Sequence, residues 1–303
     1  MSQVTIIDVS PRDGLQTETE LVSTEDKVKL IHKLTEAGLG KVEVSSFVHP
    51  KRVPQMADAE EVLKQVSQNE KLQAIVLIPN QKGFMRASHF QGLELNWAAS
   101  ATETFSDKNL GMTMDRNFEI FNDVIKEAKS KGIKICFSIA VSFGCPYEGK
   151  VKEEKVLKLV EKAVQAGADR IGIADTIGIA TPDEVDSLFR KVLDMAGETE
   201  VSFHIHDTRG LGIANAYSAY LAGVRIFETA VSGIGGCPFA PGSAGNLATE
   251  DLVYLFERMG IDTGINVTKL FEAADFAASL TSKMPLGRIR HLDRERTVKE
   301  MIK

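Results

Sequence analysis

The amino-acid sequence predicts an α/β fold of the (β/α)8 TIM-barrel type with a short extra helical segment at the C-terminus. Short apolar, β-branched runs alternate with longer amphipathic stretches along the chain, and eight strand candidates can be counted. The turn after the first of them lacks the glycine-rich dinucleotide signature expected of an open, doubly wound sheet. Strict alternation predicts parallel strands joined by crossovers, and eight of them favour closure into a barrel.

The strand candidates are short runs rich in aliphatic residues. They lie at residues 4–10, 41–47, 72–79, 93–100, 133–143, 170–175, 201–207 and 226–232. Helical periodicity marks the segments between and after them, at residues 24–37, 54–66, 82–89, 115–131, 152–166, 182–195, 213–222 and 249–259. Helix-entry signals stand at Ser23, at Thr181 before Pro182, and at Thr249 before two acidic residues.

Glycine marks the joints from helix to strand. Gly38, Gly132, Gly167 and Gly223 each come just before an apolar run, where a left-handed residue ends a helix. A further amphipathic helix is expected at 266–281. We therefore expect one catalytic barrel domain over residues 1–303, with 266–303 as a helical C-terminal extension, because such barrels span about 250 residues.

Composition narrows the classes of function. Hydrophobic residues make up 43% and charged residues 26% of the chain, as in a globular protein with a sizeable core. The net charge of −6 and the lack of long basic runs argue against a nucleic-acid partner or an anionic membrane. No apolar run is long enough for a transmembrane helix, and a strand pattern beginning at Val4 leaves no room for a targeting segment. Three scattered cysteines form no disulfide framework, so we expect a cytoplasmic location.

The seventh strand candidate carries two histidines at its C-terminal end, the end at which barrels of this kind place their sites. His204 and His206 are two residues apart, so both side chains lie on the same face of the strand. A single histidine there is often a satisfied core residue. Two neighbouring imidazoles buried without a ligand would be costly, and the pair therefore predicts a metal site.

Oxygen ligands for that metal are expected from the neighbouring strands. Asp13 follows the first strand and Asn246 lies in the loop after the eighth. Strands seven, eight and one are consecutive in a closed barrel, so Asp13, His204, His206 and Asn246 should converge. Nitrogen and oxygen donors without a thiolate suit Mg²⁺ or Mn²⁺, with Zn²⁺ or Co²⁺ as alternatives. Such an ion can acidify a substrate hydroxyl that lies next to a carbonyl or carboxylate.

Other polar residues extend this candidate site. Glu43 on the second strand is placed to orient Arg12, and Asp175 at the end of the sixth to accept from a histidine or handle substrate protons. The alternative for both carboxylates is a capping or supporting role. Cys237 lies in a glycine-rich loop, residues 233–242, that can close over a substrate. It is a candidate acid/base thiol, with a structural role as the alternative.

Six segments, in order through almost the whole chain, resemble the 3-hydroxy-3-methylglutaryl-CoA lyase family. They are Ser-Pro-Arg-Asp-Gly-Leu-Gln at 10–16, Val-Glu-Val-Ser-Ser-Phe at 42–47, Phe-Gly-Cys-Pro-Tyr-Glu-Gly at 143–149, Asp-Thr-Ile-Gly at 175–178, His-Ile-His-Asp-Thr at 204–208 and residues 233–251. The Arg-Asp and His-x-His elements are similar to those of a wider group that includes acyl-CoA condensing synthases. The glycine-rich loop with its cysteine resembles the cleaving enzymes more specifically.

The resemblance implies a divalent-metal-dependent lyase that cleaves 3-hydroxy-3-methylglutaryl-CoA to acetyl-CoA and acetoacetate, as in leucine degradation. It implies that Arg12 stabilises the enolate, that Cys237 transfers protons and that Glu43 and Asp175 support the site. It also implies an acyl-CoA substrate and a homodimer. Basic loop residues that can reach the coenzyme are Lys51, Arg52, Lys82, Lys108 and Lys150.

Three positions depart from the pattern of that family. Ser10 stands where glycine is expected, Glu228 stands in a strand where aspartate and small polar residues are expected, and Phe137 lies near an expected tyrosine. A lyase for a related 3-hydroxyacyl-CoA with another C3 substituent is therefore an alternative. A condensing synthase and a non-enzymatic metal or acyl-CoA binding protein are the remaining ones.

Overall fold

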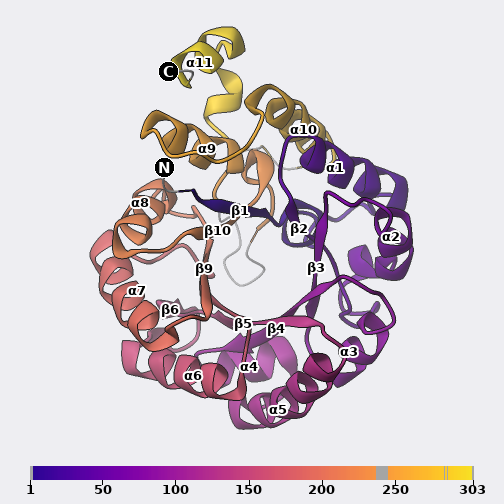
Figure 1. Ribbon diagram of the computed structural model, residues 1–303, viewed down its shortest axis with the longest axis vertical. Coiled ribbons are helices and arrows are strands. Elements are labelled where there is room, and N and C mark those ends of the chain that lie inside the picture. Colours follow the sequence, from indigo (N-terminus) through magenta and orange to yellow (C-terminus); the bar gives the residue numbers. More distant parts are fainter. Residues whose placement is uncertain (1–2, 237–244, 283, 285, 302–303) are drawn as a thin grey trace.

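The computed structural model describes residues 3–236, 245–282, 284 and 286–301. Eight strands form a closed barrel in the order β1-β10-β9-β8-β5-β4-β3-β2, and all pairs around the ring are parallel. Figure 1 shows the ring of strands with helices on its outside. The predicted (β/α)8 fold is confirmed.

Each strand begins within one residue of its predicted start, and the strands end up to three residues before their predicted ends. They are β1 (Thr5–Asp8), β2 (Lys41–Ser46), β3 (Gln73–Ile78), β4 (Glu94–Ser100), β5 (Lys134–Ala140), β8 (Arg170–Asp175), β9 (Glu200–Ile205) and β10 (Ile226–Thr229). Residues 141–143, predicted as the end of the fifth strand, lie outside it, and Val141 has a positive φ of 53°. A two-stranded hairpin follows, formed by β6 (Gly144–Cys145) and β7 (Gly149–Lys150).

The predicted helices are present with small shifts at their ends. They are α1 (Thr24–Glu36), α2 (Ala59–Val66), α3 (Gln81–Ala87), α5 (Met114–Ser130), α6 (Glu153–Ala166), α7 (Pro182–Ala196), α8 (Gly212–Ala222), α9 (Thr249–Arg258) and α10 (Val267–Ser279). A separate 3₁₀ turn, Pro54–Met56, divides the predicted segment 54–66. No helix was predicted at α4 (Glu103–Leu110), whereas α11 (Arg294–Met301) lies within the extension that was expected to be helical.

The helix ends show the expected chemistry, with one correction. The Ser23 hydroxyl accepts from the amide of Asp26, and Thr181 forms a capping box with Glu184. Gly167 ends α6 with a φ of 90°, a conformation that glycine adopts without steric cost. Thr249, in contrast, is the first residue inside α9, because its hydroxyl donates instead to Asp8.

Asp8 connects the segments that follow the first and the last strand of the barrel. Its Oδ1 accepts from the amide of Ser10 at 2.9 Å, and its Oδ2 accepts from the amide of Val231 at 2.9 Å and the hydroxyl of Thr249 at 2.8 Å. These donors lie at the ends of β1 and β10 and at the start of α9. Asp8 thereby fixes the relative position of the loops that follow the first and last strands.

The C-terminal extension packs beside this junction, where Figure 1 places α9, α10 and α11 together. The amides of Leu286 and Gly287 donate to the carbonyl of Ser232, at 2.9 and 3.2 Å. The amide of Arg288 donates to the carboxylate of Asp251. The extension is therefore attached to the segment between β10 and α9.

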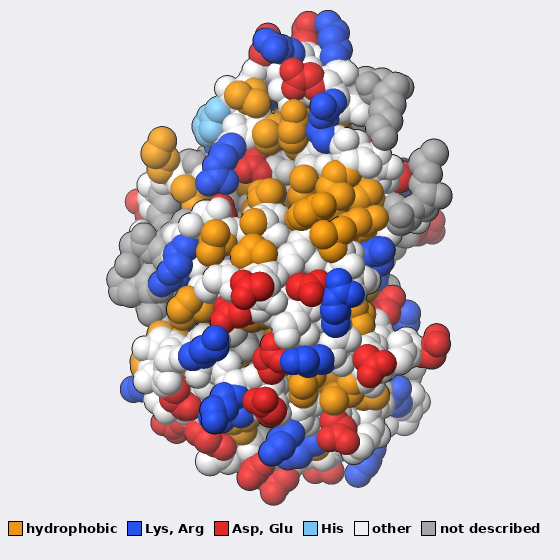
Figure 2. Space-filling view, turned by 90° about the vertical axis from the view of Figure 1, so that its left-hand side faces the viewer, with side chains coloured by type: hydrophobic (Ala, Val, Ile, Leu, Met, Phe, Trp, Pro, Cys, Tyr) orange, Lys and Arg blue, Asp and Glu red, His pale blue; other side chains and the backbone are white. Residues whose placement is uncertain are grey.

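One face of the molecule carries both charged and apolar side chains. Figure 2 shows hydrophobic side chains gathered on the flank where α8 lies. Tyr217 and Leu221 of α8 are 43% and 55% exposed. Within the described residues, no helix has the length and apolar character to cross a membrane.

Candidate metal centre

A tight turn places Arg12 and Asp13 over the mouth of the barrel. The chain leaves β1 in a π-helical turn, Ser10–Gly14, in which the amides of Arg12, Asp13 and Gly14 all donate to the carbonyl of Val9. Pro11 suits the start of such a turn because its φ is already helical. All five residues of the turn are buried. Both functional side chains are consequently held at the carboxyl end of the first strand.

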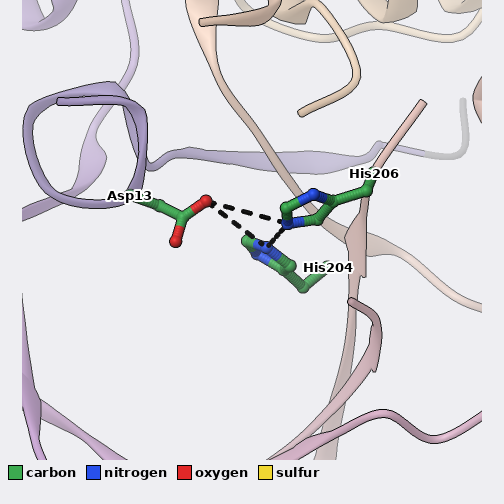
Figure 3. Close-up of side chains that lie close together, drawn as sticks. All are labelled: Asp13, His204 and His206. Carbon is green, nitrogen blue, oxygen red and sulfur yellow. Dashed lines mark hydrogen bonds and ion pairs between the residues drawn. The ribbon is translucent and has the colours of Figure 1, made fainter. Parts of the chain in front are cut away.

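Asp13, His204 and His206 form a compact cluster at that mouth. Their potential ligand atoms all lie within 4.8 Å of one another (Figure 3). The Oδ2 atom of Asp13 is 3.7 Å from Nε2 of His206 and 4.0 Å from Nε2 of His204. The two Nε2 atoms are 3.1 Å apart. Two nitrogens and a carboxylate oxygen thus point to one small volume.

Asn246 completes the cluster. Backbone hydrogen bonds from Asp207 to Gly245 and from Leu247 to Ile205 place Asn246 beside His206. Its Nδ2 donates to Oδ2 of Asp13 at 2.9 Å and to the carbonyl of Ile234 at 3.1 Å. Its Oδ1 is buried and lacks a hydrogen-bond partner among the described residues. Because a buried acceptor without a partner is costly, this oxygen suits a cation ligand.

Arg12 is held from two sides. Its Nε donates to Glu43 at 2.5 Å, and its Nη1 donates to Oδ1 of Asp13 at 2.6 Å. Glu43 is fixed in turn by the amide of Asn96, which donates to its Oε1 at 2.8 Å. The side chain of Gln16 also donates to Oδ1 of Asp13, at 2.7 Å. The guanidinium is therefore restrained and buried, with 7% of Arg12 exposed.

The electrostatics favour metal ligation by Asp13 and by His206. Burial alone would raise the pKa of Asp13, but the charges of Arg12 and the two histidines hold it at about 2, so the carboxylate is ionised. Burial and the neighbouring His204 lower the pKa of His206 to about 4, which keeps its imidazole neutral. Burial opposes protonation of His204 too, but contact with Glu228 and Asp13 raises its pKa.

Of the other expected catalytic residues, Asp175 lies away from the cluster. The oxygens of Asp175 accept from the amides of Ile179 and Ala180, at 2.9 and 3.0 Å, and in the described structure they contact neither histidine. Burial raises the pKa of Asp175 to about 6. Its carboxylate thus shapes the loop after β8, the capping alternative considered above. Cys237 lies outside the described residues.

A cavity of about 510 Å³ opens beside the cluster. Arg12, Asp13, His204 and His206 form one part of its wall. Small side chains line another part, namely Ala98, Ser138, Ala140 and Ala174. Of the five basic loop residues expected near the coenzyme, Arg52 lines this cavity. The space is therefore bordered by the candidate metal ligands, a buried guanidinium and a basic residue.

Sequence reasoning did not assign a role to several residues that hold the site together. Glu228 appeared only as a departure from the family pattern, Gln16 only as the last residue of the segment 10–16, and Asn96 and Asp8 carried no signal. Asn96 contacts Glu43 across 53 residues, and Asp8 contacts Thr249 across 241 residues. Spacing along the sequence gives no indication of such pairs.

The fold and the site define a class: a (β/α)8 barrel with a metal-type donor set at the carboxyl ends of its strands. The chain matches the HMGL-like family model over residues 3–277, and it belongs to that family. It is 41% identical to the mitochondrial hydroxymethylglutaryl-CoA lyase of Macaca fascicularis over 287 residues, covering 95% of this chain and 88% of the relative. The human protein named cytoplasmic 3-hydroxy-3-methylglutaryl-CoA lyase is 38% identical, with 92% and 76% covered.

Solved structures agree with this assignment. An HMG-CoA lyase from Acinetobacter baumannii, in complex with coenzyme A and 3-methylmalate, has a TM-score of 0.90 and 38% identity, with 95% of this chain and 94% of that chain covered. The hydroxymethylglutaryl-CoA lyase of Pseudomonas aeruginosa has a TM-score of 0.91 and 34% identity, with 98% of both chains covered.

Proposed function

We propose that this protein is a divalent-metal-dependent carbon–carbon lyase that cleaves 3-hydroxy-3-methylglutaryl-CoA to acetyl-CoA and acetoacetate. Membership of the HMGL-like family and relatives named for this activity support the proposal. The observation that carries it is the convergence of Asp13, His204 and His206 beside the buried Arg12 in one cavity.

The residues proposed to hold the metal are Asp13, His204, His206 and Asn246, with Mg²⁺ or Mn²⁺ as the ion. The Asp13 carboxylate is ionised and His206 is neutral. The Oδ1 atom of Asn246, which has no hydrogen-bond partner among the described residues, supplies a further oxygen. When bound, the ion would lower the pKa of a coordinated substrate hydroxyl and polarise a neighbouring oxygen. Nitrogen and oxygen donors of this kind suit Mg²⁺ or Mn²⁺.

Arg12 is proposed to stabilise the negative charge that develops when the bond breaks. Loss of the proton from the C3 hydroxyl allows the bond between C2 and C3 to break, and the acetyl-CoA fragment leaves with the electron pair as an enolate. A cation fixed beside the thioester oxygen stabilises that charge without reorganising during the reaction. Glu43 and Asp13 provide the fixation, because both hold the guanidinium in place.

Cys237 is proposed to transfer the proton that converts the enolate to acetyl-CoA, from the glycine-rich loop. Glu43 and Asp175 are proposed as supporting residues, Glu43 through Arg12 and Asp175 through the loop it holds at Ile179 and Ala180. Cys237→Ala is expected to lower turnover while leaving metal affinity unchanged. Full activity of this variant would contradict the role of the thiol.

A second candidate is a lyase for a related 3-hydroxyacyl-CoA with a different C3 substituent. The small side chains of Ala98, Ala140 and Ala174 support it, because they leave room in the cavity beside the cluster. Comparison of kcat/KM for the methyl compound and for analogues with hydrogen or ethyl at C3 distinguishes the two. A condensing synthase would instead form the bond from acetyl-CoA and a keto acid.

The test of metal dependence uses protein stripped with a chelator. Turnover of 3-hydroxy-3-methylglutaryl-CoA should disappear and return when Mg²⁺ or Mn²⁺ is added. Turnover that persisted in the stripped protein would refute the metal mechanism. Absence of cleavage together with activity on an analogue would refute only the substrate.

Assembly, location and pathway stay predictions. The named relatives include mitochondrial and cytoplasmic proteins, and we propose a cytoplasmic location for this chain and a role in leucine degradation. We also propose a homodimer. Light scattering should then give about twice the chain mass of 33.1 kDa, and a mass equal to that of one chain would contradict the dimer.

A further inference from the structure

Glu228 lies directly beside His204 in the wall of the barrel. The two residues are register partners on the parallel strands β10 and β9. Oε2 of Glu228 is 3.4 Å from Nδ1 of His204, within hydrogen-bonding reach. Glu228 is 2% exposed and His204 9%. The histidine therefore has a buried carboxylate on one ring nitrogen, while its Nε2 lies near Asp13 and His206.

The other oxygen of Glu228 is held by two donors. The Ser202 hydroxyl donates to Oε1 at 2.8 Å, and Nη1 of Arg170 donates to the same oxygen. Ser202 also accepts from Arg170 at 2.6 Å. The two oxygens thus have separate partners, and the carboxylate has little freedom to turn away from His204.

Arg170 is itself fixed on its far side. Its Nε and Nη2 donate to Oε1 of Glu94, at 2.9 and 2.6 Å. Arg170 and Glu94 are 1% and 4% exposed. A buried arginine between two carboxylates forms a rigid charged layer beneath the candidate metal centre, because separating any member leaves a buried charge unpaired.

The two histidines differ in what their Nδ1 atoms contact. Nδ1 of His206 is buried and, within the described part of the chain, makes no hydrogen bond. His204 alone has a carboxylate on the nitrogen opposite the cluster. In metal sites, such an outer carboxylate fixes the tautomer and the ring orientation of the ligating histidine.

We propose that Glu228 is a positioning residue: its carboxylate keeps the proton of His204 on Nδ1, so that Nε2 offers its lone pair to the metal. This inference rests on the metal-dependent function proposed above. Arg170 and Ser202 act through Glu228 by holding its carboxylate toward the histidine.

The substitution Glu228→Gln gives a sharp test because the network determines how the amide must orient. Arg170 and Ser202 both donate to Oε1, so the carbonyl oxygen of glutamine has to face them. Its NH₂ group then faces Nδ1 of His204 and can only donate to it. The proton of the imidazole is forced onto Nε2, where it blocks metal ligation.

Two measurements follow from this design. Long-range ¹H–¹⁵N spectra of the metal-free protein above neutral pH should show His204 as the Nδ1–H tautomer in the wild type and as the Nε2–H tautomer in Glu228→Gln. Titration with Mn²⁺, followed by paramagnetic resonance, should show roughly 10- to 100-fold weaker binding in the variant. Glu94→Gln is the matched control, since it alters the same arginine without touching a histidine, and should keep the wild-type tautomer and Mn²⁺ affinity.

The outcomes separate this inference from the function on which it rests. An Nε2–H tautomer of His204 in the wild type, or equal Mn²⁺ affinity in Glu228→Gln, would overturn it. An equal loss of affinity in Glu94→Gln would also overturn it, because the charged layer would then act only structurally. If the wild type bound no Mn²⁺ but both proteins showed the expected tautomers, the control of the His204 tautomer by Glu228 would stand, and the metal mechanism would fall.

Discussion

Arg12 and Asp13 are adjacent in sequence yet have different proposed tasks. Asp13 directs Oδ2 toward the histidines, whereas its Oδ1 accepts from Arg12 and Gln16. One carboxylate therefore links the candidate metal position to the guanidinium. A change in Arg12 should affect the reacting charge more than the metal, because the histidines and Asn246 remain.

Substitution of Arg12 tests this division. Arg12→Gln should lower kcat by roughly 10²- to 10³-fold, the usual cost of losing a donor to a developing negative charge. Mn²⁺ affinity should stay within a few-fold of the wild type. A variant that lost both properties equally would show that Arg12 acts through Asp13 instead of on the substrate.

Removal of a proposed metal ligand should weaken metal binding, which substitution of Arg12 should leave nearly unchanged. His206→Ala should weaken Mn²⁺ binding in a direct titration and abolish turnover at metal concentrations that saturate the wild type. His89→Ala, at an exposed histidine outside the cavity, is the control and should match the wild type. Unchanged Mn²⁺ affinity in His206→Ala would remove this residue from the ligand set.

At the scale of elements, Glu250 connects α9 to the segment after β10. Both of its oxygens accept from the amide of Ser232, and Gly287 of the extension is so close that a Cβ there would lie 2.0 Å from Oε1. Burial raises the pKa of Glu250 from 4.5 to about 8. The carboxyl group is thus protonated in the folded protein near neutral pH.

This pKa shift predicts how stability depends on pH. The folded state binds the Glu250 proton more tightly than the unfolded state does. The contribution of this proton to the free energy of unfolding is therefore fully present below about pH 4.5 and is lost as pH rises through about 8. In chelator, the Tm of Glu250→Gln should fall less steeply over that window than the wild-type Tm. Glu36→Gln, at an exposed site, should follow the wild type. Parallel curves for the wild type and Glu250→Gln would contradict the shift.

The alternation of strands and helices was predictable because buried segments have recognisable patterns of apolar residues. Every strand of the barrel was found from its apolar run, and the His-x-His spacing alone indicated that His204 and His206 share a face. The helix α4 was missed because only Phe105 and Ser106 of its eight residues are buried, which leaves no amphipathic period. The turn at Ser10–Gly14 was expected, but its π-helical geometry was not, because that geometry depends on one shared acceptor, the carbonyl of Val9.

The convergence of Asp13, His204 and His206 and the contact of Glu43 with Arg12 were predictable, whereas the other supporting contacts were not. Barrel adjacency brings Asp13, His204 and Asn246 together from the strand order alone. The pairing of Arg170 with Glu94 depends on which side chains meet inside the barrel, across 76 residues of sequence. The orientation of Asp175 toward backbone amides was likewise decided by the path of a loop, which periodicity does not describe.

At the scale of the whole molecule, we propose that barrel and extension form a single cooperative unit. The extension donates to Ser232 and to Asp251, so its removal should expose buried acceptors near the candidate metal centre. A chain ending at residue 281 should unfold in one transition at a Tm at least several degrees lower, since it loses among others the amide donors of residues 286–289 to Ser232 and Asp251, each worth roughly 0.5–1.5 kcal/mol.

The substitution Gly287→Ala should reproduce part of that loss, because the added Cβ would meet Glu250. Both variants should keep the far-ultraviolet spectrum of the barrel. Two separate transitions in the full-length protein would show instead that the extension is an independent domain.

The hydrogen bonds of Asp8 have a consequence for synthesis. They join Asp8 to Val231 and Thr249, which lie 223 and 241 residues later in the chain. The proposed ligands straddle the same junction, from Asp13 to Asn246, so the site cannot exist on a nascent chain until almost all of it has left the ribosome. A cation that binds only the closed ring stabilises closure by RT ln(1 + c/Kd), where c is the free cation concentration. Newly made chains in metal-starved cells should therefore remain open longer and be degraded faster, which pulse-chase labelling would measure.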